Sequence, residues 1–337
     1  MKNSLLKSFA LAALLAVISV AAVAQTNRNA ASQSASTLLS SLPPSDGVAF
    51  IKVRRVLDEA MPKLLAENPS QVAALNNELA EFKTRTGLDP RSFEELALGF
   101  QFSHPGPAVT KIQTVALARG TFNSNALVAA GRMAANGKYV EQQYQGKTIY
   151  IFTLDRQLRL FGLWDLKLRD LAVTSINRNT LALGDLEAVK GALDANRDRK
   201  HADPDLVAMA SQDPSAIVGF GGNISESLME TLRVKYRGVA REMTAVRKVY
   251  GSLGMTNADL ELMLAARTVD TYSAKNLSDT VEGLKQLAGF FIGRLPAAKE
   301  SLARAALSNM KVTTQGNDLQ VRTAVAQAQV APLIRGN

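Results

Sequence analysis

The chain has 337 residues, of which 47% are hydrophobic and only 6% aromatic, so it can bury a large core built mainly from Ala, Leu and Val. Cysteine is absent and the only histidines are His104 and His201, which excludes disulfides, thiol nucleophiles, thiolate metal sites and imidazole-rich metal sites. The formal net charge of +9 is compatible with an anionic lipid, a polysaccharide or a nucleic acid as partner, but solubility explains it more simply.

The first 24 residues have the organisation of a cleavable secretory signal peptide. Lys2 and Lys7 form a positive region, Phe9–Val20 is apolar, and Ala22-Val23-Ala24 is a small-x-small cleavage site. The apolar run is short for a membrane span of roughly 20 residues, although an uncleaved anchor is the alternative interpretation. We expect cleavage after Ala24 to leave 37 basic and 30 acidic residues, a net charge of +7. The mature chain should be periplasmic or secreted and should lack a transmembrane helix.

The mature chain begins with a polar segment and a sharply patterned strand-to-helix transition. Residues 25–41 are rich in Ser, Asn, Ala and Thr, which predicts a flexible leader. The turn at Leu42–Gly47 leads to a strand at Val48–Val53. Val56–Leu65 then has helical spacing, with a bend or restart at Pro62. A second helix begins at Pro69 and ends at Gly87, with an apolar face at Val72, Leu75, Leu79 and Phe82.

Strands and helices alternate through the rest of the first half. We expect strands at Leu96–Phe102 and Gln113–Phe122, and hairpins at Tyr144–Phe152 and Leu171–Gly184. One helix should run from Asn123 or Ser124 to Ala135, and another should follow Asp185 as its N-cap.

A polar stretch, Asn196–Asp205, marks the boundary between two halves, with a linker at residues 197–212. The second half should contain a strand, a long helix, an extended segment, a helix capped by Ser278, a helix that starts at Pro296 and a terminal hairpin. The corresponding ranges are Ile217–Phe220, Ser225–Ser252, Leu260–Thr271, Ser278 onwards, Pro296–Leu307, and Met310–Thr314 with Leu319–Val325. The apolar spacing places Val281, Leu284, Leu287 and Phe291 on the inner face of the helix capped by Ser278.

The order of elements in residues 42–196 returns in residues 213–334, which predicts an internal duplication. The turn Gly87-Leu88-Asp89-Pro90, for example, is echoed by Gly254-Met255-Thr256-Asn257. Strands joined by hairpins indicate antiparallel sheets. The predicted fold class is therefore α+β, with two related halves that each form an antiparallel sheet with helices packed mainly on one face.

Two glycine motifs resemble nucleotide-binding loops but lack an essential residue. Gly146-Lys147-Thr148 resembles the end of a phosphate loop, yet the glycine needed five positions earlier is replaced by Glu141, so we predict a hairpin turn. Gly219–Gly222 resembles a dinucleotide fingerprint, yet Ile224 stands where its third glycine should be. We predict that these glycines allow a strand to pack closely against a helix.

No set of residues in the sequence amounts to a reaction. The chain has no G-x-S-x-G nucleophile elbow, and both histidines lie in polar, Pro-containing segments typical of loops. The acid pairs Asp58-Glu59 and Glu94-Glu95 are adjacent, so their side chains should diverge on a helix or a strand. We predict no catalytic, cofactor-binding or metal-binding residues, although a pair of carboxylates distant in sequence remains open.

One patterned row of charge lies on the predicted helix Ser225–Ser252. Arg233, Arg237 and Arg241 recur every four residues and Lys248 continues the row, opposite an apolar face. Such a row can bind lipid head groups, an acidic glycan or an acidic protein surface, and a solvated helix face is the simpler explanation. Nucleic acid is disfavoured by the export signal and by the lack of interleaved aromatic residues.

Three phrases give the chain a family resemblance: Leu42-Pro43-Pro44-Ser45-Asp46, Thr86-Gly87-Leu88-Asp89-Pro90, and Leu181-Ala182-Leu183-Gly184-Asp185 followed by Ala188-Val189. They resemble uncharacterised exported bacterial proteins with duplicated α+β halves, a resemblance that supports the fold and implies no catalytic residues. We predict a non-enzymatic binding or envelope-associated protein that contacts a partner or an anionic surface. The alternatives are a hydrolase with carboxylates in a surface cleft and a structural subunit of an envelope assembly.

Overall fold

The computed structural model describes residues 35–66, 68–86, 89–106, 109–153, 158–160, 164–166, 170–224, 244–256 and 258–334. The predicted signal peptide and the predicted cationic residues Arg233, Arg237 and Arg241 lie outside these residues. Within the described ranges, no helix is long and apolar enough to cross a membrane.

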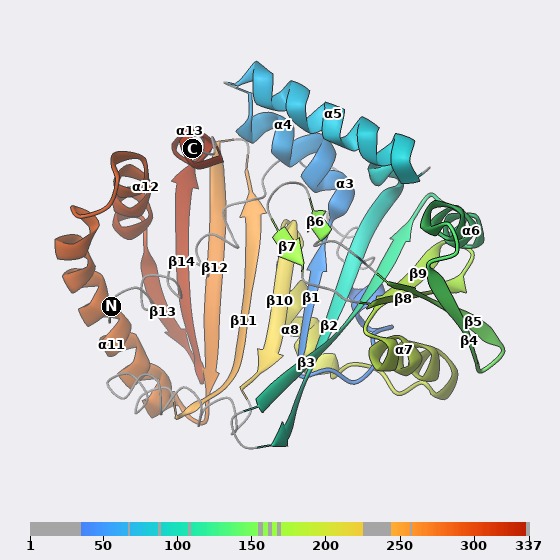
Figure 1. The fold of residues 1–337 in the computed structure, drawn as a ribbon. Coiled ribbons are helices and arrows are strands. Elements are labelled where there is room, and N and C mark those ends of the chain that lie inside the picture. The colour runs from blue at the N-terminus through green and yellow to red at the C-terminus, as the bar shows by residue number, and fades with distance from the viewer. Residues whose placement is uncertain are drawn as a thin grey trace.

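A single antiparallel sheet of twelve strands forms the frame of the described molecule (Figure 1). Its order from edge to edge is β13-β14-β12-β11-β10-β1-β2-β3-β9-β8-β5-β4. The strands are β1 Gly47–Ile51, β2 Phe93–Gly106, β3 Val109–Gly120, β4 Tyr139–Tyr144, β5 Lys147–Thr153, β8 Asp170–Asn177, β9 Thr180–Gly184, β10 Val218–Asn223, β11 Val246–Met255, β12 Asp259–Thr268, β13 Lys311–Gln315 and β14 Asp318–Ala326. A separate short hairpin joins β6 Leu158–Leu160 to β7 Trp164–Leu166.

The predicted α+β class with antiparallel pairing is confirmed, but the residues of the two predicted halves share one sheet rather than forming one each. The first strands of the two halves, β1 and β10, lie side by side at its centre, where Gly47 pairs with Gly222 and Ile51 with Val218. Every expected hairpin is present, including the β4–β5 turn at Gln145-Gly146 that the phosphate-loop-like sequence was predicted to form.

Helices cover both faces of the sheet, so the prediction that they pack mainly on one face is wrong. They are α3 Val53–Arg55, the π-helix η1 Val56–Ala60, α4 Met61–Leu64, α5 Pro69–Thr86, the 3₁₀ turn η2 Pro90–Ser92, α6 Ser124–Ala135, α7 Leu186–Asp198, α8 Pro204–Ser211, α11 Thr271–Ile292, α12 Ala297–Ser308 and α13 Gln327–Ile334. In Figure 1, α11 and α12 lie at the β13 end of the sheet, and α6 and α7 lie at the β4 end. The predicted restart at Pro62 is real, because Pro62 stands in the first turn of α4 directly after the π-helix.

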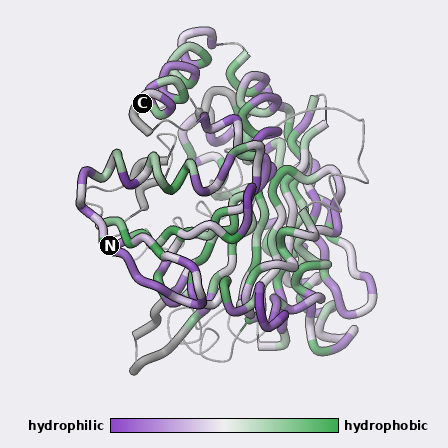
Figure 2. The backbone as a smooth tube through the Cα atoms, turned by 90° about the vertical axis from the view of Figure 1, so that its right-hand side faces the viewer, coloured by the Kyte–Doolittle hydropathy of each residue, from purple (hydrophilic) through white to green (hydrophobic). Residues whose placement is uncertain are grey.

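Two core clusters lie on opposite faces of the sheet. On one face, residues of α7 and α8 pack with Val48, Val115 and Tyr250. On the other face, residues of α4, α12 and α13 pack with Leu253 and Leu260. Tyr250 and Leu253 are both in β11 but an odd number of residues apart, so they point to opposite sides. Figure 2 shows hydrophobic residues gathered along the strands, whereas the helices alternate between hydrophilic and hydrophobic residues.

The predicted leader at residues 25–41 is wrong for its last part. Residues 35–39 are helical, and Ala35, Leu38 and Leu39 are buried in the core together with Leu42. Burial of these apolar side chains offsets the entropy of ordering a segment whose composition is otherwise polar.

The predicted linker at residues 197–212 contains α8, which packs on strands from both halves. Gly219 and Gly221 of β10 make this contact possible: a Cβ at Gly219 would lie 2.1 Å from the Ala210 carbonyl oxygen, and one at Gly221 would lie 2.8 Å from the Leu206 carbonyl oxygen. The prediction that these glycines allow close strand–helix packing is therefore confirmed, although the helix precedes the strand instead of following it.

The predicted long helix Ser225–Ser252 is wrong at its C-terminal end, where Val246–Met255 form β11. Residues 225–243 lie outside the described residues. The helix predicted to begin at Ser278 begins seven residues earlier, at Thr271, because Asp270 caps it by accepting a 2.7 Å hydrogen bond from the Ser273 amide.

Candidate functional site

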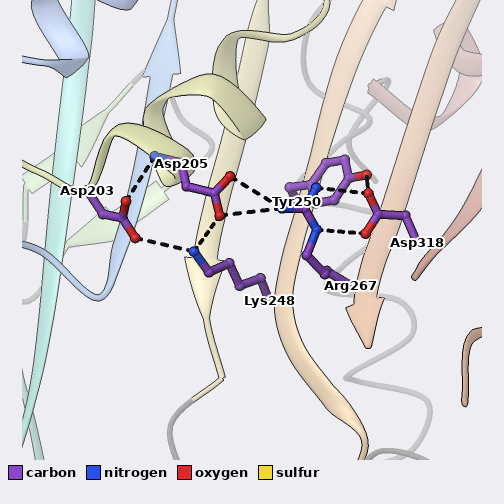
Figure 3. Close-up of polar contacts among 6 residues, drawn as sticks. All are labelled: Asp203, Asp205, Lys248, Tyr250, Arg267 and Asp318. Atoms are coloured by element: carbon purple, nitrogen blue, oxygen red, sulfur yellow. Dashed lines mark hydrogen bonds and ion pairs between the residues drawn. The ribbon is translucent and has the colours of Figure 1, made fainter. Parts of the chain in front are cut away.

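A network of charged side chains lies on the α8 face of the sheet, at the end of β11, β12 and β14 (Figure 3). The register places it there, because Lys248 pairs with Arg267 and Arg267 pairs with Asp318 across neighbouring strands. Two residues of α8, which packs on this face of the sheet, complete the group: its N-cap Asp203, and Asp205 in its first turn. We call this the charged cluster: Asp203, Asp205, Lys248, Tyr250, Arg267 and Asp318.

Lys248 ties α8 to β11. Its Nζ donates to Asp205 Oδ2 at 2.6 Å and to Asp203 Oδ2 at 3.3 Å. Desolvation by burial lowers the pKa of Lys248, but the hydrogen bonds to the two carboxylates outweigh it, so the pKa of Lys248 is raised. The hydrogen bond from Lys248 lowers the pKa of Asp205. The acidic residues also suit the N-terminus of α8, whose dipole favours negative charge.

Arg267 ties β12 to β14 and to α8. Its Nε and Nη2 donate to the two carboxylate oxygens of Asp318 at 2.8 and 3.0 Å, and Nη1 donates to Asp205 Oδ1 at 3.3 Å. Figure 3 shows the guanidinium between the two carboxylates. The Tyr250 hydroxyl donates to Asp318 Oδ2 at 2.9 Å, and burial together with this hydrogen bond raises the pKa of Tyr250. The hydrogen bond to Asp318 also raises the pKa of Arg267.

The charged cluster ties α8 to β11, β12 and β14 through hydrogen bonds and ion pairs. The pKa of Lys248, Tyr250 and Arg267 is raised and that of Asp205 is lowered, which favours charged Lys248, Asp205 and Arg267 and a neutral Tyr250. Lys248, which we predicted to extend a cationic row on a helix, stands on a strand and is neutralised by two aspartates. The charged cluster could not be predicted from the sequence, because its members come from four elements whose relative positions are set only by the fold.

A second feature is a row of large apolar side chains on α11 that the described protein leaves uncovered. Leu284, Leu287, Phe290 and Phe291 are 52%, 54%, 78% and 63% exposed. We call these four residues the apolar side of α11. The helix contacts β12, β13 and β14, and its buried residues are Ala274 and Ile292. The prediction that Leu284, Leu287 and Phe291 form an inner face is therefore wrong.

Basic residues follow the C-terminal end of this apolar side along the chain. The Arg294 guanidinium lies 5.9 Å from the centre of the Phe291 ring. Lys299 and Arg304 stand on the following helix, α12, where Glu300 pairs with Arg304 at 2.7 Å. The end of α11 and the start of α12 therefore combine exposed aromatic rings with a local excess of positive charge.

A hollow of about 550 Å³ separates α11 from α12. Lys285 and Glu282 line it from α11, and Arg304 and Ser308 line it from α12. Lys285 is fixed by a 2.8 Å hydrogen bond from Nζ to the Met310 carbonyl oxygen.

A third polar feature is Lys52 at the end of β1, which is only 3% exposed. Its Nζ donates to the Pro214 carbonyl oxygen at 3.0 Å. Desolvation, followed by repulsion from Arg55, lowers the pKa of Lys52 to about 8. Residue type alone argues against this burial, because lysine is usually exposed, although Lys52 lies two residues after the buried Phe50.

The remaining predicted motifs do not form a site in the described structure. The acid pair Glu94-Glu95 diverges as expected, since Glu94 pairs with Arg54 at 3.0 Å and Glu95 pairs with Arg119 at 2.5 Å. His201 is exposed. Among the described residues, no three His, Asp or Glu side chains are placed to hold a metal ion.

No family model and no curated protein matches the chain. Among solved structures, crystal form III of TP0453 is similar over 88% of this chain and 96% of that chain, with a TM-score of 0.45 and 9% sequence identity. Crystal form I of the same protein gives a TM-score of 0.45 at 8% identity over the same shares. Similarity at this level carries no information about function.

Proposed function

We propose that this chain is an exported, non-enzymatic protein that docks on an anionic lipid surface through the apolar side of α11. The observation that carries the proposal is the exposure of Leu284, Leu287, Phe290 and Phe291 along a helix whose spacing would suit burial. Large apolar side chains that gather on one exposed surface mark a place of interaction.

The chemistry of this surface suits lipid. Phe and Leu on one side of a helix, with Lys and Arg beside them, are typical of helices that lie in the interface between head groups and acyl chains. Complete burial of an exposed Leu or Phe side chain contributes about 1.5–3 kcal/mol, so even partial insertion of four such side chains supplies several kcal/mol. Arg294 and Lys299 add attraction to anionic lipids of about 1 kcal/mol per residue near the surface, whereas the charge of Arg304 is balanced by Glu300.

Two expectations from the sequence agree with this proposal. The predicted signal peptide would bring the chain to the envelope, where lipid surfaces are available. The predicted net charge of +7 after cleavage favours anionic over zwitterionic surfaces. The charged cluster, by contrast, uses its charges internally and leaves docking to α11.

The experiment is co-sedimentation of the purified chain with phosphatidylcholine vesicles that contain or lack phosphatidylglycerol. We expect binding to the anionic vesicles to fall about tenfold or more in the double variant Phe290→Ser with Phe291→Ser. A matched control is Met133→Ser with Val140→Ser, which removes residues that are 82% and 63% exposed but lie far along the sheet on α6 and β4. The control should bind as the original chain does.

Two results would overturn the proposal. One is equal vesicle binding by the Phe290→Ser, Phe291→Ser variant and the original chain. The other is a stable dimer in sedimentation analysis that this variant converts to monomer, because the apolar side of α11 would then be covered by a second copy.

We also infer that the two halves are related by duplication, as the sequence echoes suggested. The inference is supported by matching orders outward from the centre: β1-β2-β3-β9-β8 on one side and β10-β11-β12-β14-β13 on the other. A helix follows the third strand in both, α6 after β3 and α11 after β12. A superposition of residues 47–184 on residues 218–326 that left these strands unmatched would contradict it.

A further inference from the structure

The hollow between α11 and α12 has the composition of a small-molecule site. It is an open groove of about 550 Å³. It combines two cations, one carboxylate, two neutral hydrogen-bonding groups and an apolar part: Lys285, Arg304, Glu282, Gln286, Ser308, Ile292 and Leu307.

Both cations are held in place at the hollow. Lys285 Nζ donates to the Met310 carbonyl oxygen and lies 3.6 Å from Glu282 Oε2. Arg304 donates from Nε and Nη2 to the same oxygen of Glu300, at 2.9 and 2.7 Å. An ammonium has three donors and a guanidinium five, so each side chain keeps donors for a ligand while its position is fixed.

We propose that this hollow binds a phosphodiester that carries hydroxyl groups, of the phosphoglycerol type. Lys285 and Arg304 would hold the phosphate, and Glu282, Gln286 and Ser308 would hydrogen-bond to the hydroxyls. Glu282 and the Glu300 partner of Arg304 balance the two cations, so recognition of the phosphate rests on the remaining donors of Lys285 and Arg304. That this phosphodiester belongs to a lipid head group rests on the proposed function. Phe290 and Phe291, which would enter the lipid surface, directly follow Gly289, which lines the hollow, on α11.

Gly289 offers a direct way to fill the hollow. A Cβ at this position would meet nothing within 4 Å, and the residue lines the hollow, so a larger side chain fits there without a clash and occupies the space of the ligand. Gly283 lies on the same helix, and a Cβ there also meets nothing within 4 Å, but it does not line the hollow. Both glycines stand inside a helix, where Leu is favoured over Gly, so both Leu variants should fold.

The test is a nuclear magnetic resonance titration of the purified chain with glycerophosphoglycerol, which has no acyl chains. We expect saturable shifts at the amides of Gln286, Gly289 and Ser308. Affinity should fall about tenfold or more in Gly289→Leu and in Lys285→Gln with Arg304→Gln, and should stay unchanged in Gly283→Leu. No saturable shift at millimolar concentrations, or equal affinities in the Gly289→Leu and Gly283→Leu variants, would overturn the proposal.

Two further measurements separate this proposal from the proposed function. The Phe290→Ser, Phe291→Ser variant should lose vesicle binding and still bind glycerophosphoglycerol; loss of both would contradict a hollow that is independent of the aromatic rings.

The second measurement compares vesicles that contain phosphatidylglycerol with vesicles that contain phosphatidylserine at equal charge, and it identifies whether the bound phosphodiester comes from a lipid. A preference for phosphatidylglycerol that Gly289→Leu removes supports a lipid head group, whereas binding of the soluble diester without that preference supports a free phosphodiester at the same hollow.

Discussion

Lys52 couples the pH of the solution to the stability of the fold. Burial, followed by repulsion from Arg55, lowers the pKa of this lysine to about 8, whereas an unfolded chain leaves it near 10.4. Between these values the unfolded state binds more protons, so the free energy of unfolding should rise as pH increases from about 8 to about 10.4. Below pH 8 the folded protein bears the full cost of a buried charge.

We expect Lys52 to contribute on the order of 1–3 kcal/mol to this rise, because one pKa unit corresponds to about 1.4 kcal/mol. The measurement is urea unfolding at pH 7.5 and pH 10 for the original chain and for Lys52→Met. The variant should show a smaller increase between the two pH values. An equal increase in both proteins would mean that Lys52 is charged in the fold across this range.

At the scale of elements, the contact between α8 and β10 depends on Gly219. A Cβ at this position would lie 2.1 Å from the Ala210 carbonyl oxygen and 2.5 Å from the Phe50 ring, so the helix or the strand would have to move. We expect Gly219→Ala to destabilise the protein by about 2 kcal/mol or more, which is the size expected for overpacking against backbone.

The matched control is Gly283→Ala on α11, where a Cβ has open space. This variant should stabilise the helix by about 0.5–1 kcal/mol, because alanine is a better helix former than glycine. Thermal unfolding of the two variants measures both effects. If Gly219→Ala unfolded at the same temperature as the original chain, the close approach of α8 would not be a constraint.

Most elements could be predicted because turns and hairpins are encoded locally. The hairpin of β8 and β9 and the N-cap at Asn123 follow directly from residue type and spacing. The prediction was wrong at the end of the helix Ser225–Ser252 for a physical reason. Val246 and Tyr250 are four residues apart, a spacing that places two side chains on one face of a helix and also on one face of a strand. For α11 the spacing of residues identified an apolar row, but spacing does not show whether that row packs against the rest of the protein or stays exposed.

The candidate sites were less predictable than the fold. The charged cluster joins residues from α8, β11, β12 and β14, and the hollow joins two helices, so both depend on packing that spacing does not encode. Leu284, Leu287 and Phe291 were visible as an apolar row, and only the position of α11 on the sheet revealed their exposure.

At the scale of the whole molecule, the central pair β1–β10 should make the two halves unfold together. The main core cluster contains residues from both, including Leu117 and Val189 from the first and Tyr250 and Met263 from the second. We expect a single transition when unfolding is followed both by circular dichroism and by fluorescence of Trp164. Two separated transitions would mean that each half is stable without the other.

The position of β1 also sets an order of events in folding. β1 can pair with β2 as soon as the first half has been made, but its other edge must wait for β10, which lies far along the chain. Until then an apolar strand keeps one row of backbone groups unpaired, and unpaired edges are where chains associate wrongly. Such distant pairing also slows folding, because a long loop must close before the contact stabilises the fold. The sheet can therefore be completed at its centre only after the second half of the chain is available.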